Sequence, residues 1–362
     1  MSTTVSPLSM SMKIPAYGAR AANAPLEPLE IERRKPGPHD IEIEILYCGI
    51  CHSDLHKVSD DWGGTHFPLV PGHEIVGRVA SHGTSAARFR EGDSVGVGCI
   101  VDSCRVCPEC RAGHEMFCEK GVTFTFDSFD QTTKTWTQGG YSRKIVVDER
   151  YVLRVPKGLD PTEAAPLMCA GITTYSPLRH FGCKPGDQVA VIGLGGLGHM
   201  TVKLAASMGA EVTVLSTSHD KERDASRLGA KHFVTTKEPG ALDALQGRFN
   251  LIVDTISAPQ DLNQLMALLR SYGTLVLLGL PPTATAATPI NAGSLIFGNK
   301  RLAGSNIGGI QETQEMLDYC GKKGVIADVE VIKAEQINDA YKRMQRGDVR
   351  YRFVINAGSL EA

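Results

Sequence analysis

The segment QVAVIGLGGLGHMTVKLAASMG, residues 188–209, decides the fold class of this chain. It begins with an apolar run of strand length, continues through a glycine-rich turn and ends in a stretch with helical spacing. Three glycines stand in G-x-G-x-x-G spacing between the strand and the helix, which is the context that this motif requires. We expect the turn and the first N–H groups of the helix to bind the pyrophosphate of a dinucleotide. The residues assigned to this site are Gly193, Gly195, Gly196, Leu197 and Gly198.

The chain that follows alternates between apolar strands and helices. Helical spacing is found in DKERDASRLGA (220–230) and DLNQLMALLRSYG (261–273). Repeated strand–helix units of this length predict an α/β fold with a parallel, doubly wound sheet and right-handed crossovers. The strand-like runs after the first strand are EVTVL (211–215), HFVT (232–235), FNLIVDTI (249–256) and TLVLLG (274–279).

The residues before the glycine segment show a different pattern. DIEIEIL (40–46) alternates with a period of two, and HEIVGRVA (73–80) and YSRKIVVD (141–148) are similar. Many short strands between Gly and Pro turns predict a β-rich, barrel-like domain. An amphipathic helix in QETQEMLDYCGKKG (311–324) and a strand in RYRFVI (350–355) follow the sheet. At 362 residues, the chain is long enough for two domains.

Composition excludes some function classes. The formal net charge is −2 and no run of like charges occurs, so binding to nucleic acid or to an anionic membrane has no electrostatic support. No apolar segment reaches the ~18 residues that span a bilayer, and the first residues, MSTTVSPLSMSMK, do not match a signal peptide. We therefore expect a cytoplasmic protein, in which the ten cysteines are metal ligands or core residues rather than disulfides.

The end of the second strand indicates which dinucleotide is bound. An NAD site would carry an acidic residue there, which bonds the ribose hydroxyls. This chain instead has Ser216, Thr217 and Ser218, with Lys221 shortly after them. Hydroxyls and an ammonium group suit a 2′-phosphate, so the pattern favours NADP(H). The alternative is that Ser218 merely caps the next helix and that Lys221 is a solvated surface residue.

Four cysteines lie within CRVCPECRAGHEMFC, residues 104–118. Four thiolates in a short loop can surround one Zn²⁺ tetrahedrally and leave no position for water, which describes a structural zinc site. A zinc-ribbon binding module is the competing use of such a loop. The predicted ligands are Cys104, Cys107, Cys110 and Cys118.

A second group of candidate ligands is distributed along the chain. A catalytic zinc needs three protein ligands and one open position. Taken alone, a histidine or a cysteine of this group is more often a packed core residue than a ligand, and spacing does not join the group. The candidates are Cys51 in YCGICHSDLH, His73 and Glu74 in VPGHEIVG, and Cys169 in PLMCAGITTYS.

Several of these motifs, in the order CGICHSDLH, PGHEIVG, the four-cysteine loop, CAGITTY, GLGGLG, STS-x-x-K and RYRFV, resemble the zinc-dependent medium-chain alcohol dehydrogenases. Within that family the chain is similar to the cinnamyl alcohol dehydrogenase branch, which includes broad-range aldehyde reductases. The resemblance covers nearly the whole chain apart from the first dozen residues. It implies a GroES-like catalytic domain with both zinc sites at residues 1–165 and 306–362, and a Rossmann domain at residues 166–305. It also implies a homodimer.

The resemblance assigns roles residue by residue. Cys51, His73 and Cys169 would bind the catalytic zinc, Glu74 would enter its coordination shell during ligand exchange, and Asp54 would orient His73. Ser53 and His56 would form a proton relay; without the resemblance, a turn residue and a surface residue are the simpler interpretation. Contacts to the cofactor would come from Thr173, His52, Arg352 and Ser305, the last in GSNIGG (304–309). For His52 and Arg352 the alternative is simple exposure at the surface.

The implied reaction is reversible hydride transfer between NADP(H) and an aldehyde or primary alcohol, aromatic or aliphatic. Trp62, Trp136 and Phe297 are candidates for the substrate pocket, although packing explains each equally well. Cys48 and Cys99 are interpreted as core residues. Two alternatives remain, namely reduction of conjugated C=C or C=N bonds, and a catalytically silent NADP-binding scaffold.

Overall fold

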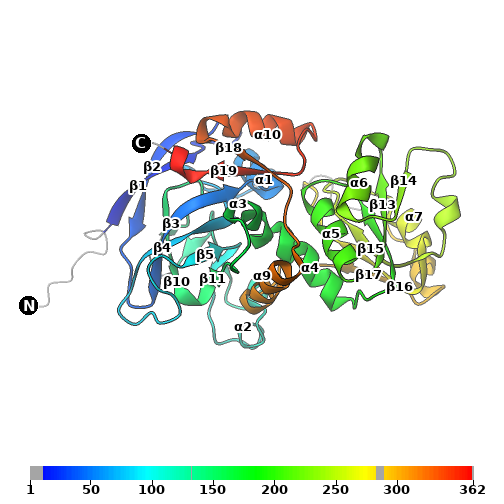
Figure 1. Cartoon of the computed structure of the whole chain (residues 1–362), viewed down its shortest axis with the longest axis horizontal. Coiled ribbons are helices and arrows are strands. Elements are labelled where there is room, and N and C mark those ends of the chain that lie inside the picture. The colour runs from blue at the N-terminus through cyan, green and yellow to red at the C-terminus, as the bar shows by residue number, and fades with distance from the viewer. Residues whose placement is uncertain (1–10, 132, 283–288, 361–362) are drawn as a thin grey trace, which may run out of the picture. The chain divides into compact units, whose positions relative to one another are not determined.

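The computed structural model describes residues 11–131, 133–282 and 289–360 of the chain (Figure 1). Two compact units are present. The first comprises Met1–Cys169, Gly308–Gly321 and Asp328–Ala362, and the second comprises Ala170–Ile307 and Lys322–Ala327. In the part of the chain that is described, no helix combines the length and the apolar character needed to cross a membrane.

The second unit is built on a six-stranded sheet in which every pairing is parallel. The strand order is β14-β13-β12-β15-β16-β17, so the direction of winding reverses between β12 and β15. This is the order of a doubly wound sheet, in which a ligand binds at the carboxyl ends of the strands beside the reversal. The bounds are β12 Gln188–Ile192, β13 Glu211–Ser216, β14 His232–Thr235, β15 Phe249–Asp254, β16 Leu269–Leu277 and β17 Arg301–Gly304.

Helices connect these strands and cover their apolar side chains. One cluster packs Phe249 and Ile252 of β15 against Leu265 and Met266 of α7, all at most 6% exposed. The helices of the unit are α4 Ala170–His180, α5 Gly196–Ser207, α6 Glu222–Leu228, α7 Leu262–Ala267 and α8 Ala292–Ile296, with short 3₁₀ turns η5 His219–Lys221 and η6 Asp243–Leu245.

The prediction of one helix over residues 261–273 is wrong in its second half. Helix α7 ends at Ala267, and β16 begins two residues later at Leu269. Leu269 is fully buried and pairs with Phe249 of β15. Packing in the sheet therefore determines its conformation, although the local sequence has helical spacing. Tyr272 then takes a left-handed conformation with φ 63°, which a helix does not accommodate.

The first unit is β-rich, as the alternating patterns predict. Its main sheet runs β11-β5-β4-β3-β19-β18, with β10 also paired to β3 (Figure 1). Ile41, Ile43 and Ile45 of β3 are each at most 1% exposed and supply the core face of the central strand. The bounds are β3 Asp40–Gly49, β4 Ile75–His82, β5 Ser94–Val97, β10 Lys144–Asp148, β11 Leu153–Arg154, β18 Val329–Ile332 and β19 Arg352–Asn356.

Three two-stranded sheets and several short helices complete this unit. The strand pairs are β1 Ser11–Gly18 with β2 Glu27–Arg34, β6 Ile100–Asp102 with β7 Thr123–Phe124, and β8 Phe129–Asp130 with β9 Thr135–Trp136. The helices are α1 His52–Ser59, α2 Pro108–Arg111, α3 Pro161–Ala164, α9 Ile310–Lys323 and α10 Ile337–Gln345. The 3₁₀ turns are η2 Glu115–Phe117, η3 Glu149–Tyr151, η4 Ala165–Met168, η8 Ala334–Gln336 and η9 Ala357–Ser359.

Candidate metal centres and dinucleotide site

The four clustered cysteines converge in the first unit. The Sγ atoms of Cys104, Cys107, Cys110 and Cys118 all lie within 4.8 Å of one another. Local backbone geometry brings them together, because Cys107 is the N-cap of α2 and its Sγ accepts from the Cys110 amide at 3.5 Å. The Cys104 sulfur accepts from the Cys107 amide at 3.4 Å. Backbone N–H groups lower the pKa of Cys104 to about 6, which favours the thiolate that a metal binds.

This donor set fits a closed zinc site. Four sulfur atoms are the ligands of a structural Cys₄ site, and no oxygen or nitrogen donor belongs to the group. Arg105, which adopts a left-handed φ of 65°, lets the chain turn between the first two ligands. Its guanidinium pairs with Asp102 at 2.7 Å and with Asp148 at 3.2 Å, and so ties the loop to the sheet.

The second group of candidate ligands also converges. Ligand atoms of Cys51, His73, Glu74 and Cys169 lie within 4.8 Å of one another, and all four residues are buried. The two sulfurs are 4.0 Å apart although their residues are 118 positions apart in the chain. Hydrogen bonds from Cys169 and His73 lower the pKa of Cys51 against the effect of its burial. Thiol, imidazole and carboxylate donors in one buried cluster fit a zinc ion with an exchangeable position.

Each ligand stands at the boundary of a secondary-structure element. Cys51 is the N-cap of α1, and Cys169 directly precedes α4. His73 and Glu74 directly precede β4. Such positions fix the backbone while the side chains remain free to point into a common space.

Asp54 holds two of these ligands in place. It is fully buried, and its Oδ1 accepts from His73 Nδ1 at 3.2 Å and from the Gly72 amide at 3.0 Å. Its Oδ2 accepts from the Cys51 amide at 2.8 Å and from the Tyr141 hydroxyl at 3.1 Å. The bond to Nδ1 leaves Nε2 of His73 as the metal-binding atom.

Glu74 forms a buried ion pair with Arg352. Arg352 is 3% exposed, so the alternative of a surface role for it is wrong. Burial raises the pKa of Glu74 to about 7, and the neighbouring arginine opposes that shift. Oε2 of Glu74 and Nε of Arg352 are buried and have no hydrogen-bond partner in the described part of the chain, so each group has one atom that could contact a further ligand.

Two residues beside this cluster are not among the predicted site residues. Cys99, interpreted as a core residue, is partly buried, and its thiol lies close enough to Cys169 for the two groups to influence each other's pKa. The ring of Phe126 stacks on that of His73, with centroids 5.6 Å apart. Both positions follow from pairing between segments, since the Thr125 amide donates to the Cys99 carbonyl at 3.0 Å. No local sequence signal marks this pairing. Cys48 is fully buried, as expected.

The predicted relay residues lie on α1. Ser53 Oγ is 3.7 Å from Cys51 Sγ. The Nδ1 atom of His56 is 2.7 Å from the Asp61 carboxylate, whereas its Nε2 is buried and has no hydrogen-bond partner among the residues that the structure describes. His56 is therefore not a freely solvated surface residue. The ring of Trp62 lies 4.9 Å from that of His56, and His52 is exposed.

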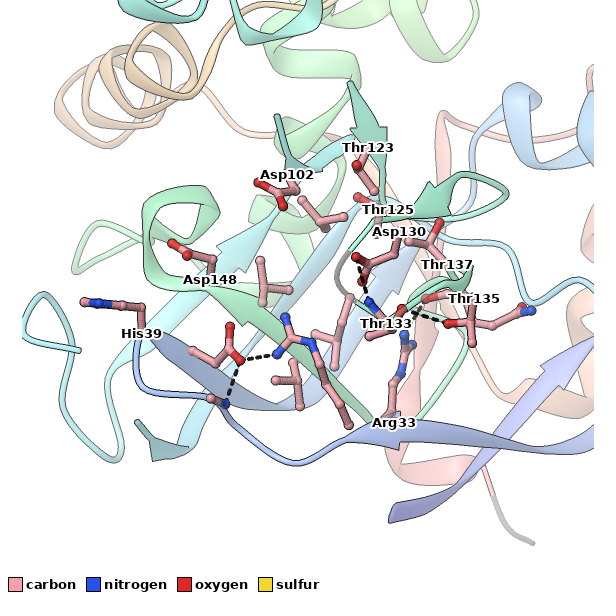
Figure 2. Close-up of a pocket in the computed structure, with 18 of the residues that line it drawn as sticks. Arg33, His39, Asp102, Thr123, Thr125, Asp130, Thr133, Thr135, Thr137 and Asp148 are labelled. Atoms are coloured by element: carbon pink, nitrogen blue, oxygen red, sulfur yellow. Dashed lines mark hydrogen bonds and ion pairs between the residues drawn. The ribbon is translucent and has the colours of Figure 1, made fainter. Parts of the chain in front are cut away.

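A cavity of about 400 Å³ in the same unit is separate from the second cluster (Figure 2). Trp136 lines it and stacks on His66 at 3.3 Å, and no lining residue is a member of that cluster. Two of the ion pairs among its lining residues join Arg34 with Asp40 and Arg150 with Asp148. Figure 2 shows its threonines, Thr123, Thr125, Thr133, Thr135 and Thr137, on one side of the cavity. This cavity is not the space beside the buried ligands, and the prediction of Trp136 in the substrate pocket stays a prediction.

The glycine turn in the second unit has the geometry that its sequence predicts. Gly193 follows β12 with φ 83°, a conformation that favours glycine, and Gly195 is the N-cap of α5. A Cβ atom on Gly198 would lie 2.2 Å from the Gly193 carbonyl oxygen, so the third glycine permits the close approach of helix and turn. Gly196 and Leu197 open α5, where amide groups are free to bind an anion.

The residues after β13 are arranged beside this turn. Ser216 is buried and Thr217 is exposed, while Ser218 caps η5 by accepting from the Asp220 amide. The Nζ atom of Lys221 donates to the Leu194 carbonyl at 2.9 Å. Ser218 therefore has the capping role of the alternative interpretation, but Lys221 is half-buried against the glycine turn rather than fully solvated.

Three further predicted residues belong to the second unit. Thr173 of α4 is 8% exposed, and its Oγ1 is buried without a hydrogen-bond partner. Ser305 directly follows β17, and its amide donates to the Leu277 carbonyl at 3.1 Å. Phe297 is 84% exposed, so its own unit does not enclose it in a pocket.

Comparisons with known proteins agree with this arrangement. Residues 37–157 match the alcohol dehydrogenase GroES-like domain, and residues 196–322 match the zinc-binding dehydrogenase family. The chain is 52% identical over 347 residues to NADP-dependent alcohol dehydrogenase C of Mycobacterium tuberculosis, which covers 96% of this chain and 99% of the relative. It is 51% identical over 350 residues to the aldehyde reductase YahK of Escherichia coli, with 96% and 99% covered.

A solved structure shows the same likeness. The cinnamyl alcohol dehydrogenase of Helicobacter pylori, complexed with NADP(H), superimposes with a TM-score of 0.92 at 39% identity and covers 97% of this chain and 100% of its own. The β-rich unit is thus GroES-like and the parallel sheet Rossmann-like, as the sequence predicts. With a family match in each unit and relatives at half identity over nearly its full length, this chain belongs to the zinc-containing medium-chain alcohol dehydrogenases.

Proposed function

We propose that this protein transfers hydride reversibly between NADP(H) and an aldehyde or primary alcohol, and that it works mainly as an aldehyde reductase. One observation carries the proposal, the buried convergence of Cys51, His73, Glu74 and Cys169. The names of the relatives, an NADP-dependent alcohol dehydrogenase and an aldehyde reductase, support the same cofactor and reaction. We assign the metal chemistry to the first unit, which extends to Cys169, four residues beyond the bound of 165 predicted from the sequence, and the dinucleotide to the second unit.

The residues of the first unit divide the work at the catalytic centre. Cys51, His73 and Cys169 would hold zinc, which when bound would supply Lewis acidity toward a substrate oxygen. Asp54 keeps the His73 ring oriented through its Nδ1 hydrogen bond. Glu74 would offer a further carboxylate ligand through Oε2, which has no hydrogen-bond partner among the described residues.

Proton transfer is assigned to Ser53 and His56. The nicotinamide of the cofactor supplies the hydride, so the reduced oxygen needs a proton from the protein side. Ser53 lies beside the ligand Cys51 and donates that proton, and His56 restores it. Because Asp61 holds Nδ1 of His56, the unpartnered Nε2 is the atom that exchanges.

The cofactor is assigned to the turn of residues 193–198 and to the hydroxyls after β13. No carboxylate that would repel a 2′-phosphate is found among the residues assigned to it, which are Ser216, Thr217, Ser218 and Lys221. We assign the nicotinamide to Thr173, whose buried Oγ1 has no partner. His52, Arg352 and Ser305 are assigned to the remaining polar groups of the cofactor.

The substrate pocket is assigned to side chains that lie near the catalytic residues. Phe126 stacks on His73 and Trp62 lies against His56, so aromatic walls stand beside both. Such walls suit aromatic or alkyl aldehydes.

We propose a homodimer that forms at the edge of the Rossmann sheet. Strand β17 is the last in its sheet and has one unpaired edge among the described strands. The apolar side chains of Tyr272, Ile296 and Phe297 are 68–84% exposed in the same unit. An exposed apolar surface beside an open strand edge suits pairing of two copies. The cytoplasm is the proposed compartment, because both clusters require reduced cysteines and all ten are free.

The test combines metal content with cofactor oxidation. Purified protein is expected to hold about two zinc ions per chain and to oxidise NADPH with benzaldehyde or cinnamaldehyde much faster than NADH. Cys169→Ser is expected to lose one zinc ion per chain and the activity. Cys183 is a half-buried cysteine outside both clusters, so Cys183→Ser is expected to keep both zinc ions and the activity. Zinc-loaded protein that turns over no aldehyde with either cofactor would overturn the proposal.

A further inference from the structure

Asp254 is a buried carboxylate at the carboxyl end of β15 that the proposed reaction does not use. It is 3% exposed. Its neighbours in the sheet are Ile192, the last residue of β12, and Leu277, the last residue of β16. The sheet reverses its winding between β12 and β15, so Asp254 stands at the edge where a dinucleotide binds in a sheet of this order.

Asp254 and its successor tie the ends of three strands together. The Asp254 side chain accepts from the Ile256 amide at 3.0 Å. Its backbone carbonyl accepts from the Leu278 amide, just beyond β16, at 2.8 Å. Thr255 Oγ1 donates to the Ile192 carbonyl at 2.8 Å. The backbone of residues 254–256 thus connects β12, β15 and β16.

This connection also positions the glycine turn. A Cβ atom on Gly193 would lie 3.0 Å from the Ile256 side chain and 3.3 Å from Thr255 Oγ1. A Cβ atom on Gly279 would lie 2.2 Å from the Ile256 carbonyl oxygen. Residues 255 and 256 are therefore packed directly against the first glycine of the dinucleotide motif, and the Asp254 side chain holds their backbone.

Among the described residues, no cationic side chain balances the charge of Asp254. Burial raises its pKa to about 6, and the hydrogen bond from the Ile256 amide is the sole opposing influence. Its register partners on β12 and β16, Ile192 and Leu277, are apolar, and the Ile256 amide of the following turn donates to its carboxylate. In the described ranges, no charged side chain contributes to the shift.

We propose that Asp254 is a positioning residue that takes up a proton when a dinucleotide binds, so that cofactor affinity increases as the pH falls. This inference rests on the proposed function, because it assumes a pyrophosphate at the glycine turn. The negative pyrophosphate disfavours a second negative charge in the same crevice and therefore favours the protonated carboxyl. By reciprocity, protonation of Asp254 favours the anion by the same factor.

Calorimetric titration with ADP-ribose tests the proposal without turnover. ADP-ribose carries the pyrophosphate but no 2′-phosphate that would itself titrate. The wild-type dissociation constant is expected to be about fivefold lower at pH 6 than at pH 8, the lower range of measured couplings. Asp254→Asn keeps an oxygen for the Ile256 amide but cannot titrate. The ratio of its dissociation constants at pH 8 and pH 6 should therefore be at least twofold smaller than that of the wild-type protein. Asp187, just before β12, likewise accepts a hydrogen bond from a backbone amide. Asp187→Asn removes its carboxylate and should keep the wild-type ratio of the dissociation constants at pH 8 and pH 6.

A second measurement does not depend on the variant. Titrations of the wild-type protein near pH 6.5 in two buffers of different ionisation enthalpy count the protons taken up with ADP-ribose, and net uptake is expected. Absence of uptake, or an equal pH dependence in wild-type protein and Asp254→Asn, would overturn the role of Asp254 while leaving the proposed function intact. Failure to bind ADP-ribose and NADPH at either pH would overturn the proposed function, and this inference with it.

Discussion

Replacing Asp54 by asparagine should release the catalytic metal while leaving the structural site intact. The Asp54 carboxylate is fully buried and accepts four hydrogen bonds, two at each oxygen. Asparagine has one acceptor oxygen, so in either orientation its NH₂ group faces two donors. One orientation leaves the Gly72 amide and His73 Nδ1 without an acceptor, and the other leaves the Cys51 amide and the Tyr141 hydroxyl.

The magnitude follows from those two lost partners. A buried donor without a partner costs about 1–3 kcal/mol, so two cost about 2–6 kcal/mol. Both orientations disturb a metal ligand, His73 in the first and Cys51 in the second. Loss of a residue that orients metal ligands lowers metal affinity about 10- to 100-fold, which agrees with the lower part of this range.

The assay is competition for zinc with a chromogenic chelator, followed together with NADPH oxidation. Asp54→Asn is expected to lose about one zinc per chain at chelator concentrations that leave the wild-type protein fully loaded, and to lose activity in parallel. Tyr141→Phe removes one of the four donors and is the graded control, with an expected cost of about 1 kcal/mol. Wild-type zinc retention and turnover in Asp54→Asn would refute the assignment of Asp54 as the residue that orients His73 and Cys51.

Three other substitutions test separate parts of the molecule. Ser216→Asp places a carboxylate at the end of β13, and should raise the KM for NADPH tenfold or more while changing that for NADH little, because like charges repel. Cys118→Ser should reduce zinc from about two ions per chain to one and lower thermal stability, measured by metal analysis and a melting curve, since a structural site contributes to folding. Gly49→Ala should disrupt the ion pair of Glu74 and Arg352, because the added Cβ would lie 2.0 Å from Glu74 Oε2. Breaking a buried pair costs about 3–5 kcal/mol, so a lower melting temperature and impaired turnover are expected, and an unchanged protein would contradict the geometry.

Local patterns predicted most of the fold. The alternation in residues 40–46 and the apolar run in 188–193 correspond to β3 and β12, because each pattern reports directly on the side-chain spacing of its own strand. The four-cysteine loop was predictable for the same reason, since its backbone N–H groups reach sulfurs only a few residues away. The helix over residues 261–273 is wrong because burial of Leu269 beside Phe249 is a contact between distant segments.

The second cluster was predictable only through resemblance, and its physical organisation explains why. Its ligands come from three segments, and the Glu74–Arg352 pair joins residues 278 positions apart. Gly49 on β3 provides the space for the Glu74 carboxylate, as the close approach of its Cβ position shows. Cys99 and Phe126 lie beside the cluster because the segments around them pair with each other. The spacing of residues in the sequence does not predict this pairing. The sheet of the first unit must therefore form before these ligands can meet, whereas the four-cysteine loop can assemble from its own fifteen residues.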